Sequence, residues 1–121
     1  MKKYVLVLVL LFVAAALFGQ SIQLGTFPVG RWLDHNYNAV WDFSSNNIRI
    51  LSTSGAVLYD FSDKTIQNFR VTMDGIQPAI TFSCPEAGRS YRFTANLPGS
   101  DVTMQIERPN EPNYSVQMRR Q

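Results

Sequence analysis

The chain has 121 residues, of which 45% are hydrophobic and 17% charged, and its formal net charge is +2. This length predicts one modest domain with a single core. The single cysteine excludes an internal disulfide, and the single histidine excludes a metal site built from several histidines.

The first nineteen residues predict a secretory signal peptide. Two lysines precede an unbroken apolar run from Tyr4 to Phe18. This run is shorter than the roughly twenty residues that span a bilayer as a helix. We expect cleavage after Gly19, with cleavage after Ala16 or retention as an anchor as the alternatives. The protein is therefore expected to be exported, to the bacterial periplasm or outside the cell, without membrane insertion after cleavage.

Removal of this segment balances the charge of the remaining chain. The segment contains two of the eleven basic side chains, so the remaining chain has nine basic and nine acidic side chains. Binding to nucleic acid or to an anionic membrane surface would require a basic stripe, which this sequence lacks. We therefore expect neither nucleic acid nor membrane as a partner.

Residues 20–28 are predicted to form an N-terminal extension, and residues 29–121 a single β domain. Apolar and polar residues alternate with a period of two throughout this domain, and no stretch of apolar residues at helical spacing is long enough for a helix. Short turn sequences rich in Gly, Asn, Pro and Ser separate the strands, which favours antiparallel neighbours in sequence order. The predicted strands are 29–33, 38–44, 47–53, 56–62, 65–73, 78–84, 89–95, 101–108 and 114–120.

The alternation assigns one apolar face to each strand. Ile66 is out of phase with Phe69, which predicts a bulge in that strand. One apolar face on eight or nine strands favours closure, since a flat sheet would leave that face bare and two edges exposed. We predict an all-β fold, a small antiparallel up-and-down meander barrel, with a two-layer sandwich as the alternative. The inward positions include Trp41, Phe43, Ile48, Ile50, Val57, Tyr59, Phe61, Phe69, Val71, Met73, Ile80, Phe82, Cys84, Tyr91, Phe93, Val102, Met104, Ile106, Tyr114, Val116 and Met118.

The sequence Gly30-Arg31-Trp32 opens the first strand and resembles the G-x-W signature of lipocalins and the wider calycin group. The resemblance implies that Trp32 closes the barrel floor and that an arginine late in the last strand packs across its ring. Arg120 has inward parity and is the expected partner, with Arg119 or a solvated C-terminal tail as the alternatives. Gly30, Trp32 and Arg120 are thus the predicted closure residues.

The chain is shorter than a typical lipocalin, so its lumen is expected to be small. Large aromatic side chains either fill this lumen or line a ligand cavity within it. The candidate cavity residues are Tyr37, Trp41, Phe43, Tyr59, Phe61, Phe69, Phe82, Tyr91, Phe93 and Met104.

No arrangement in the sequence predicts catalysis, a metal site or a cofactor. His35 falls on a predicted loop next to Asp34, and adjacent strand residues point to opposite sides. Cys84 is predicted to pack as a small hydrophobe rather than to act as a nucleophile. We therefore expect a protein that is not an enzyme and that has no catalytic residues.

Three functions remain open at this stage. The first is an exported lipocalin-like protein that binds a small hydrophobic or amphipathic ligand. The second is a protein-binding barrel, like the calycin-type inhibitors of secreted proteases, whose N-terminal extension projects into a target cleft. The third is a structural component of the cell envelope.

Overall fold

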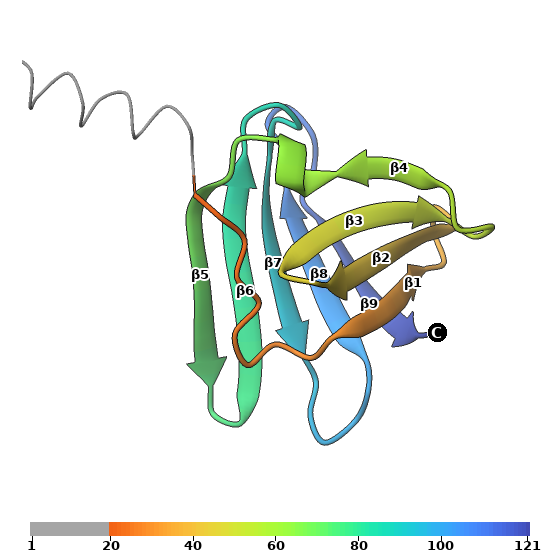
Figure 1. Ribbon diagram of the computed structural model, residues 1–121, viewed down its shortest axis with the longest axis vertical. Coiled ribbons are helices and arrows are strands. Elements are labelled where there is room, and N and C mark those ends of the chain that lie inside the picture. The colour runs from red at the N-terminus through yellow and green to blue at the C-terminus, as the bar shows by residue number, and fades with distance from the viewer. Residues whose placement is uncertain (1–19) are drawn as a thin grey trace, which may run out of the picture.

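The computed structural model describes residues 20–121, and the predicted signal peptide lies outside the described residues. This part of the chain forms nine antiparallel strands and one short 3-10 helix (Figure 1). Within it, no helix is long and apolar enough to cross a membrane. The elements are β1 (Gly30–Asp34), β2 (Ala39–Ser44), β3 (Asn47–Ser52), β4 (Val57–Asp60), η1 (Phe61–Asp63), β5 (Gln67–Asp74), β6 (Gln77–Cys84), β7 (Arg89–Ala95), β8 (Val102–Glu107) and β9 (Tyr114–Arg120).

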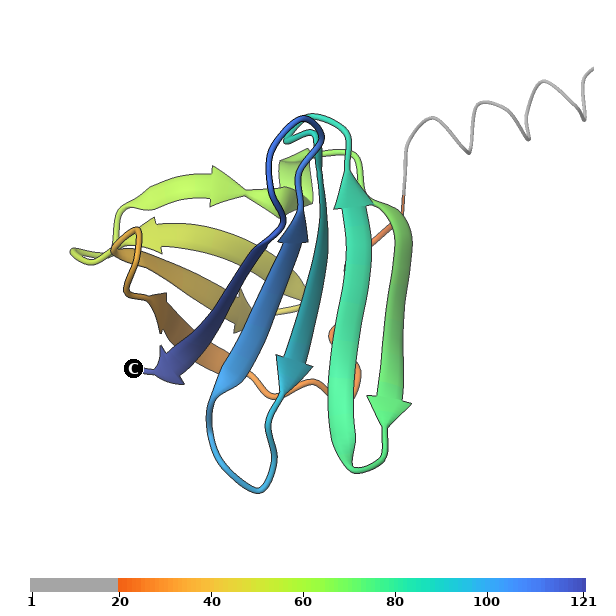
Figure 2. The ribbon, with the colours of Figure 1, turned by 180° about the vertical axis from the view of Figure 1, so that it is seen from behind.

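The strands form one curled sheet, a half-barrel with up-and-down connections. The strand order is β4-β3-β2-β1-β9-β8-β7-β6-β5. All adjacent pairs except β1–β9 are consecutive in sequence. Strands β4 and β5 are the two ends of this sheet. Figures 1 and 2 show its two parts, β1–β4 and β5–β9, curving around a common interior. The predicted all-β meander is confirmed.

The fourth strand is shorter than predicted. The alternation predicts a strand over residues 56–62, but β4 ends at Asp60 and the chain turns into η1. The Asp60 carboxylate accepts hydrogen bonds from the Ser62 backbone N–H at 2.9 Å and from its hydroxyl at 2.7 Å. Such a cap favours the turn over a continued strand. The turn places Phe61 in the core with no exposed surface.

Two irregularities in the ladders reset which residues face inward. The bulge predicted in β5 is confirmed, because the register with β6 shifts between Gln67 and Arg70. A second shift in the β3–β4 ladder places Val57 opposite Leu51 rather than with Ile50 on the inner face. The inward prediction for Val57 is therefore wrong, and its side chain is 52% exposed.

Residues 20–29 lie across the open side of the half-barrel and contribute to its core. Ile22, Leu24 and Phe27 are all buried, and Phe27 packs its ring against other core aromatic rings. The Gln20 backbone N–H donates to the carbonyl of Ile66 at 2.7 Å. In Figure 1 this segment passes in front of β5 and β6. The described extension is thus part of the barrel wall rather than a projecting arm.

Replacement of Phe27 by alanine tests this role. The ring lies 5.0 Å from Phe43 and 6.3 Å from Trp32, so its removal leaves a cavity between them. We expect Phe27→Ala to lower the free energy of unfolding by about 3–5 kcal/mol in urea denaturation. Ile76→Ala is the control, since Ile76 is 66% exposed, and it should change stability by less than about 0.5 kcal/mol. Equal stabilities for the two variants would contradict a structural role of residues 20–29.

Candidate ligand-binding site

One end of the half-barrel is closed by Trp32 and Arg120. The Trp32 side chain is 1% exposed, and its indole N–H donates to the carbonyl of Ser100 at 2.7 Å. The Arg120 guanidinium lies over the indole, with Cζ 5.2 Å from the ring centroid. Its Nη2 also donates to the carbonyl of Val29 at 2.7 Å. This end is therefore sealed by a stacked pair that also joins the first strand to the last.

Gly30 allows this close approach. A Cβ atom at this position would lie 2.8 Å from Nη2 of Arg120, which is closer than real Cβ contacts. Beyond the glycine, Trp32 pairs with Arg120 and Leu33 with Arg119 in the β1–β9 ladder. The Gln121 backbone N–H continues this pairing by donating to Arg31 O at 2.9 Å. The C-terminal end is therefore bound to β1 rather than solvated as a tail.

Aromatic side chains fill most of the interior. Phe43, Phe61 and Phe93 have no exposed surface, and Phe82 and Tyr91 are 2% and 5% exposed. Neighbouring ring centroids in this group lie between 5.0 and 6.2 Å apart. These distances are typical of packed aromatic pairs. These five candidate cavity residues are thus packed in the core itself.

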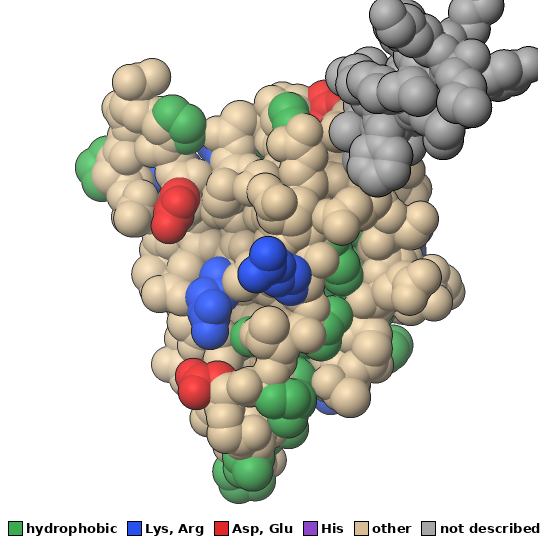
Figure 3. Space-filling view, turned by 90° about the vertical axis from the view of Figure 1, so that its left-hand side faces the viewer, with side chains coloured by type: hydrophobic (Ala, Val, Ile, Leu, Met, Phe, Trp, Pro, Cys, Tyr) green, Lys and Arg blue, Asp and Glu red, His purple; other side chains and the backbone are tan. Residues whose placement is uncertain are grey.

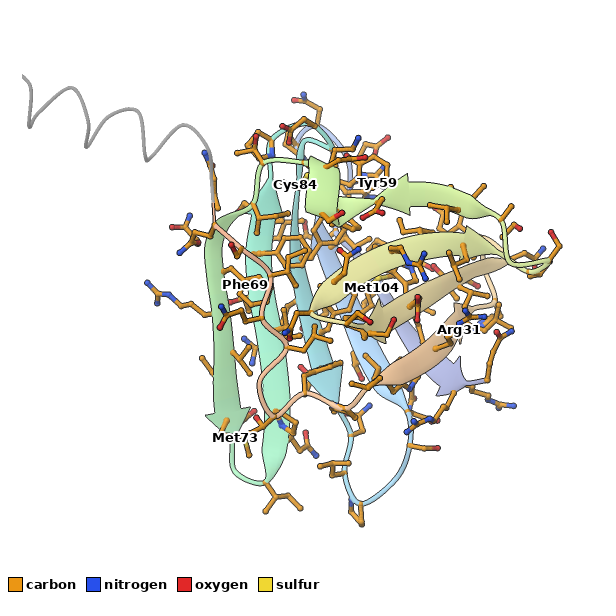
Figure 4. All side chains as sticks on the ribbon, in the orientation of Figure 1. Arg31, Tyr59, Phe69, Met73, Cys84 and Met104 are labelled. Atoms are coloured by element: carbon orange, nitrogen blue, oxygen red, sulfur yellow. The ribbon has the colours of Figure 1, made fainter. Side chains whose placement is uncertain are left out.

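Two further candidates lie at the margins of the core. Tyr59 on β4 and Phe69 on β5 are half-buried, near opposite ends of the sheet. The Tyr59 hydroxyl lies 3.8 Å from Sγ of Cys84, and Figure 4 shows these two side chains close together. Cys84 is 1% exposed and belongs to the apolar core.

The other end of the half-barrel holds a cavity of about 170 Å³. Three of the predicted residues, Tyr37, Trp41 and Met104, line this cavity, and Figure 4 shows Met104 in the interior of the half-barrel. Ile50 from β3 and Ile106 from β8 complete an apolar floor. Because Trp41, Met104 and Ile106 are each at most 5% exposed, this floor is buried and closely packed.

Polar and charged side chains surround the mouth of this cavity. Asp34, Tyr37, Arg89, Arg108 and Tyr114 all contribute to its lining. They lie at the ends of β1, β7, β8 and β9 and in the β1–β2 turn, so strand ends build the rim. Tyr37 is 63% exposed and packs its ring edge-on against Tyr114 at 5.3 Å.

The carboxylate of Asp34 accepts hydrogen bonds from other residues around the mouth. It is 2% exposed and accepts hydrogen bonds from the Tyr114 hydroxyl at 2.9 and 3.0 Å and from the Asn36 backbone N–H at 3.0 Å. Burial raises the pKa of Tyr114, and the bond to Asp34 adds to this effect, against a bond from Asn36. The hydroxyl therefore stays protonated as a donor at neutral pH.

The charged residues of the rim were not predicted from the sequence. Ile50, Ile106 and Tyr114 were assigned inward parity, but nothing in the pattern placed them at a mouth. Arg89 and Arg108 lie just at or beyond strand ends, where parity no longer assigns a face. The order of the turns could have identified this rim, because in a meander alternate turns lie at the same end of the barrel.

Within residues 20–121, the side chains that commonly bind metal ions are scattered. Residues 20–121 contain no group of three or more His, Cys, Asp and Glu side chains that could hold a metal ion. His35 is exposed on the β1–β2 turn. Comparisons with protein-family models, curated proteins and solved structures found no match to this chain.

The stacked pair at the closed end can be tested with two adjacent arginines. Arg120→Ala removes the guanidinium from the indole and the hydrogen bond to Val29, so we expect the free energy of unfolding to fall by about 1–3 kcal/mol. Arg119→Ala removes the same charge one residue away on the outer face, and should cost less than about 0.5 kcal/mol. Urea denaturation measures both, and equal losses would contradict a specific role for Arg120.

Tyr91 provides a test of core burial by pH. Burial raises the pKa of Tyr91 to about 12, against an opposing contribution from Arg89. The unfolded chain ionises this phenol near pH 10, whereas the folded chain retains the proton, so stability is lost as the pH rises from about 10 to 12. The difference corresponds to about 2–3 kcal/mol. Tyr91→Phe should therefore lose less stability than the native chain between pH 8 and 12 in urea denaturation; parallel losses would contradict this.

Proposed function

We propose that the protein is an exported, calycin-like binding protein that takes up a small amphipathic molecule at the open end of its barrel, without catalysis. The observation that carries this proposal is the cavity of about 170 Å³, with an apolar floor and a charged rim. The end of the half-barrel closed by Trp32, with the mouth at the opposite end, also agrees with the lipocalin resemblance. Export rests on the apolar N-terminal segment alone.

The volume of the cavity limits the size of the ligand. An engineered apolar cavity of about 150 Å³ in another protein binds benzene. A cavity of similar size here accommodates one aromatic ring or a short aliphatic chain. A lipid-sized ligand would extend out of the mouth, because packed aromatic rings occupy the rest of the interior. The proposed ligand is therefore a small molecule rather than a long-chain lipid.

The charges at the rim favour an acidic head group on this ligand. Asp34 accepts hydrogen bonds from Tyr114 and from a backbone amide, so its carboxylate oxygens are already engaged within the chain. Arg108 stacks on Tyr114 and pairs with Glu111 at 3.5 Å. Arg89 is not in an ion pair within residues 20–121, which leaves its guanidinium to bind a carboxylate. We infer that the ligand class is small aromatic or aliphatic carboxylic acids.

The protein-inhibitor alternative has less support in the geometry. It needs residues 20–28 to project from the barrel into a target. Ile22, Leu24 and Phe27 instead pack into the core of the same chain, at 7%, 3% and 2% exposure. Insertion into a partner would therefore expose apolar core.

Fluorescence titration with phenylacetate tests the proposal. Trp41 lines the cavity, so binding should change tryptophan emission in a saturable way. Arg89→Gln should weaken phenylacetate binding by about tenfold or more, since a hydrogen bond to a charged group contributes roughly 1.5–3 kcal/mol. The same variant should leave binding of uncharged 2-phenylethanol unchanged.

Two controls make the result specific. Arg119→Gln removes one positive charge from the outer face of β9 and should leave phenylacetate binding as in the native chain. Met104→Trp adds volume to the floor and should abolish binding of both probes. A lack of saturable signal at millimolar phenylacetate, or equal binding by the Met104→Trp variant, would contradict a ligand site at the mouth.

A further inference from the structure

The outer face of strands β5 to β9 carries a second hollow, which adjoins the mouth cavity at Ile106 and Tyr114. Its volume is about 460 Å³, within the range of roughly 300–1,000 Å³ that is typical of ligand pockets. Figure 2 shows the outer side of this part of the sheet. Figure 3, which faces the β5 edge of the sheet, shows basic side chains close together there, with acidic side chains above and below them. The hollow is lined by polar side chains of four adjacent strands and by Ser115 of β9.

A row of residues crosses the hollow in register. Arg70 of β5 pairs with Thr81 of β6, which pairs with Arg92 of β7, and Arg92 pairs with Gln105 of β8. Paired residues share one face of a sheet, and strands lie about 4.8 Å apart. The two arginines are therefore about 10 Å apart at the backbone, on one face, with a threonine hydroxyl between them. Their long side chains can approach a single anionic group from two sides.

The bulge in β5 is what places Arg70 on this face. Ile66 and Phe69 are both directed into the core, although they are three residues apart. One extra residue on β5 between Gln67 and Arg70 allows both side chains to face inward. Asn68 lies in this bulge with a left-handed φ of 55°, which asparagine tolerates better than most residues. Without the bulge Arg70 would share the inward parity of Ile66.

The charge of the hollow is not compensated within the described chain. Neither Arg70 nor Arg92 takes part in an ion pair of residues 20–121. The outer face of β1 to β3 provides the contrast, since Arg31 and Arg49 there share the buried carboxylate of Asp42. The hollow contains one acidic side chain, Glu107, which belongs to the neighbouring row of residues. Two guanidiniums against one carboxylate favour an anionic ligand.

Neutral hydrogen-bonding groups occupy the rest of the hollow. The Ser83 and Ser90 hydroxyls lie 2.9 Å apart, and the amides of Asn68, Gln105 and Asn113 also line it. Hydroxyl and amide side chains both donate and accept, which matches the hydroxyl groups of a sugar. A simple inorganic anion would use the arginines alone and leave these groups to water.

We propose that this outer hollow binds an acidic oligosaccharide, with a sugar carboxylate between Arg70 and Arg92. Nucleic acid is a poorer match, because two of the three aromatic residues in the lining, Phe82 and Tyr91, are buried. The third, Tyr114, already packs its ring against Tyr37 and Arg108. The site shares no arginine with the mouth cavity. Arg70 and Arg92 are therefore available whether or not a small acid binds at the mouth.

Calorimetric titration of the purified full chain with a uronic acid tetramer tests this site. We expect saturable binding that weakens as salt concentration rises, because both arginines remain partly accessible to solvent. Arg92→Gln and Arg70→Gln should each weaken binding by about tenfold or more. Arg92→Lys, which keeps the charge but not the fork of donors, should retain more affinity than Arg92→Gln.

Matched controls identify the site and the ligand class. Arg119→Gln removes an exposed arginine of β9 that lies outside the hollow, and should leave the affinity unchanged. A neutral hexose tetramer and inorganic sulfate should each bind at least tenfold more weakly than the uronic acid tetramer. Equal weakening by Arg119→Gln would overturn the proposal in favour of diffuse charge, and equal binding of sulfate or of the neutral tetramer would overturn the assignment to acidic sugars.

Discussion

The fold depends on the junction between the first and last strands. This ladder joins β1–β4 to β5–β9, and the Arg120 guanidinium closes it by stacking on Trp32 and by donating to Val29. Glycine at position 30 permits this placement, because a Cβ there would lie 2.8 Å from Nη2 of Arg120 and the guanidinium would have to shift. If the junction opened, two small sheets would each expose an apolar face. The residues that make the fold possible are therefore at the two ends of the domain in sequence, and their contacts are the least local in the chain.

The opposite side of the half-barrel is completed by a different device. Strands β4 and β5 are the ends of the sheet, and residues 20–29 lie across this side with Ile22, Leu24 and Phe27 in the core. The segment bonds to both flanks, through Ile66 before β5 and through Asn46 in the β2–β3 turn. An irregular segment can span this side because it makes individual hydrogen bonds instead of a ladder with fixed register. The core consequently belongs to residues 20–121 as a whole rather than to the strands alone.

Much of this arrangement was predictable from alternation and turn chemistry. Both identify the nine strands, the bulge before Arg70 and the inward parity of Arg120. Val57 was misassigned because parity assumes an uninterrupted ladder, and the shift beside Leu51 is invisible in the sequence. The packing of residues 20–29 was missed because they have no period to detect. The candidate site was only partly predictable, since parity marks Trp41 and Met104 as inward but cannot separate cavity lining from core.

The size of the barrel determines where recognition can occur. A domain of about one hundred residues closes around a narrow interior, and here Phe43, Phe61 and Phe93 occupy it. The cavity at the mouth therefore measures about 170 Å³, whereas the hollow on the outer face measures about 460 Å³. Strand β7 serves both surfaces, with Arg89 at the rim and Arg92 outside. Because alternate side chains of a strand face opposite sides, the two surfaces can differ in chemistry while sharing one rigid wall. A small filled barrel can thus bind ligands on its exterior without loss of the packing that keeps it folded.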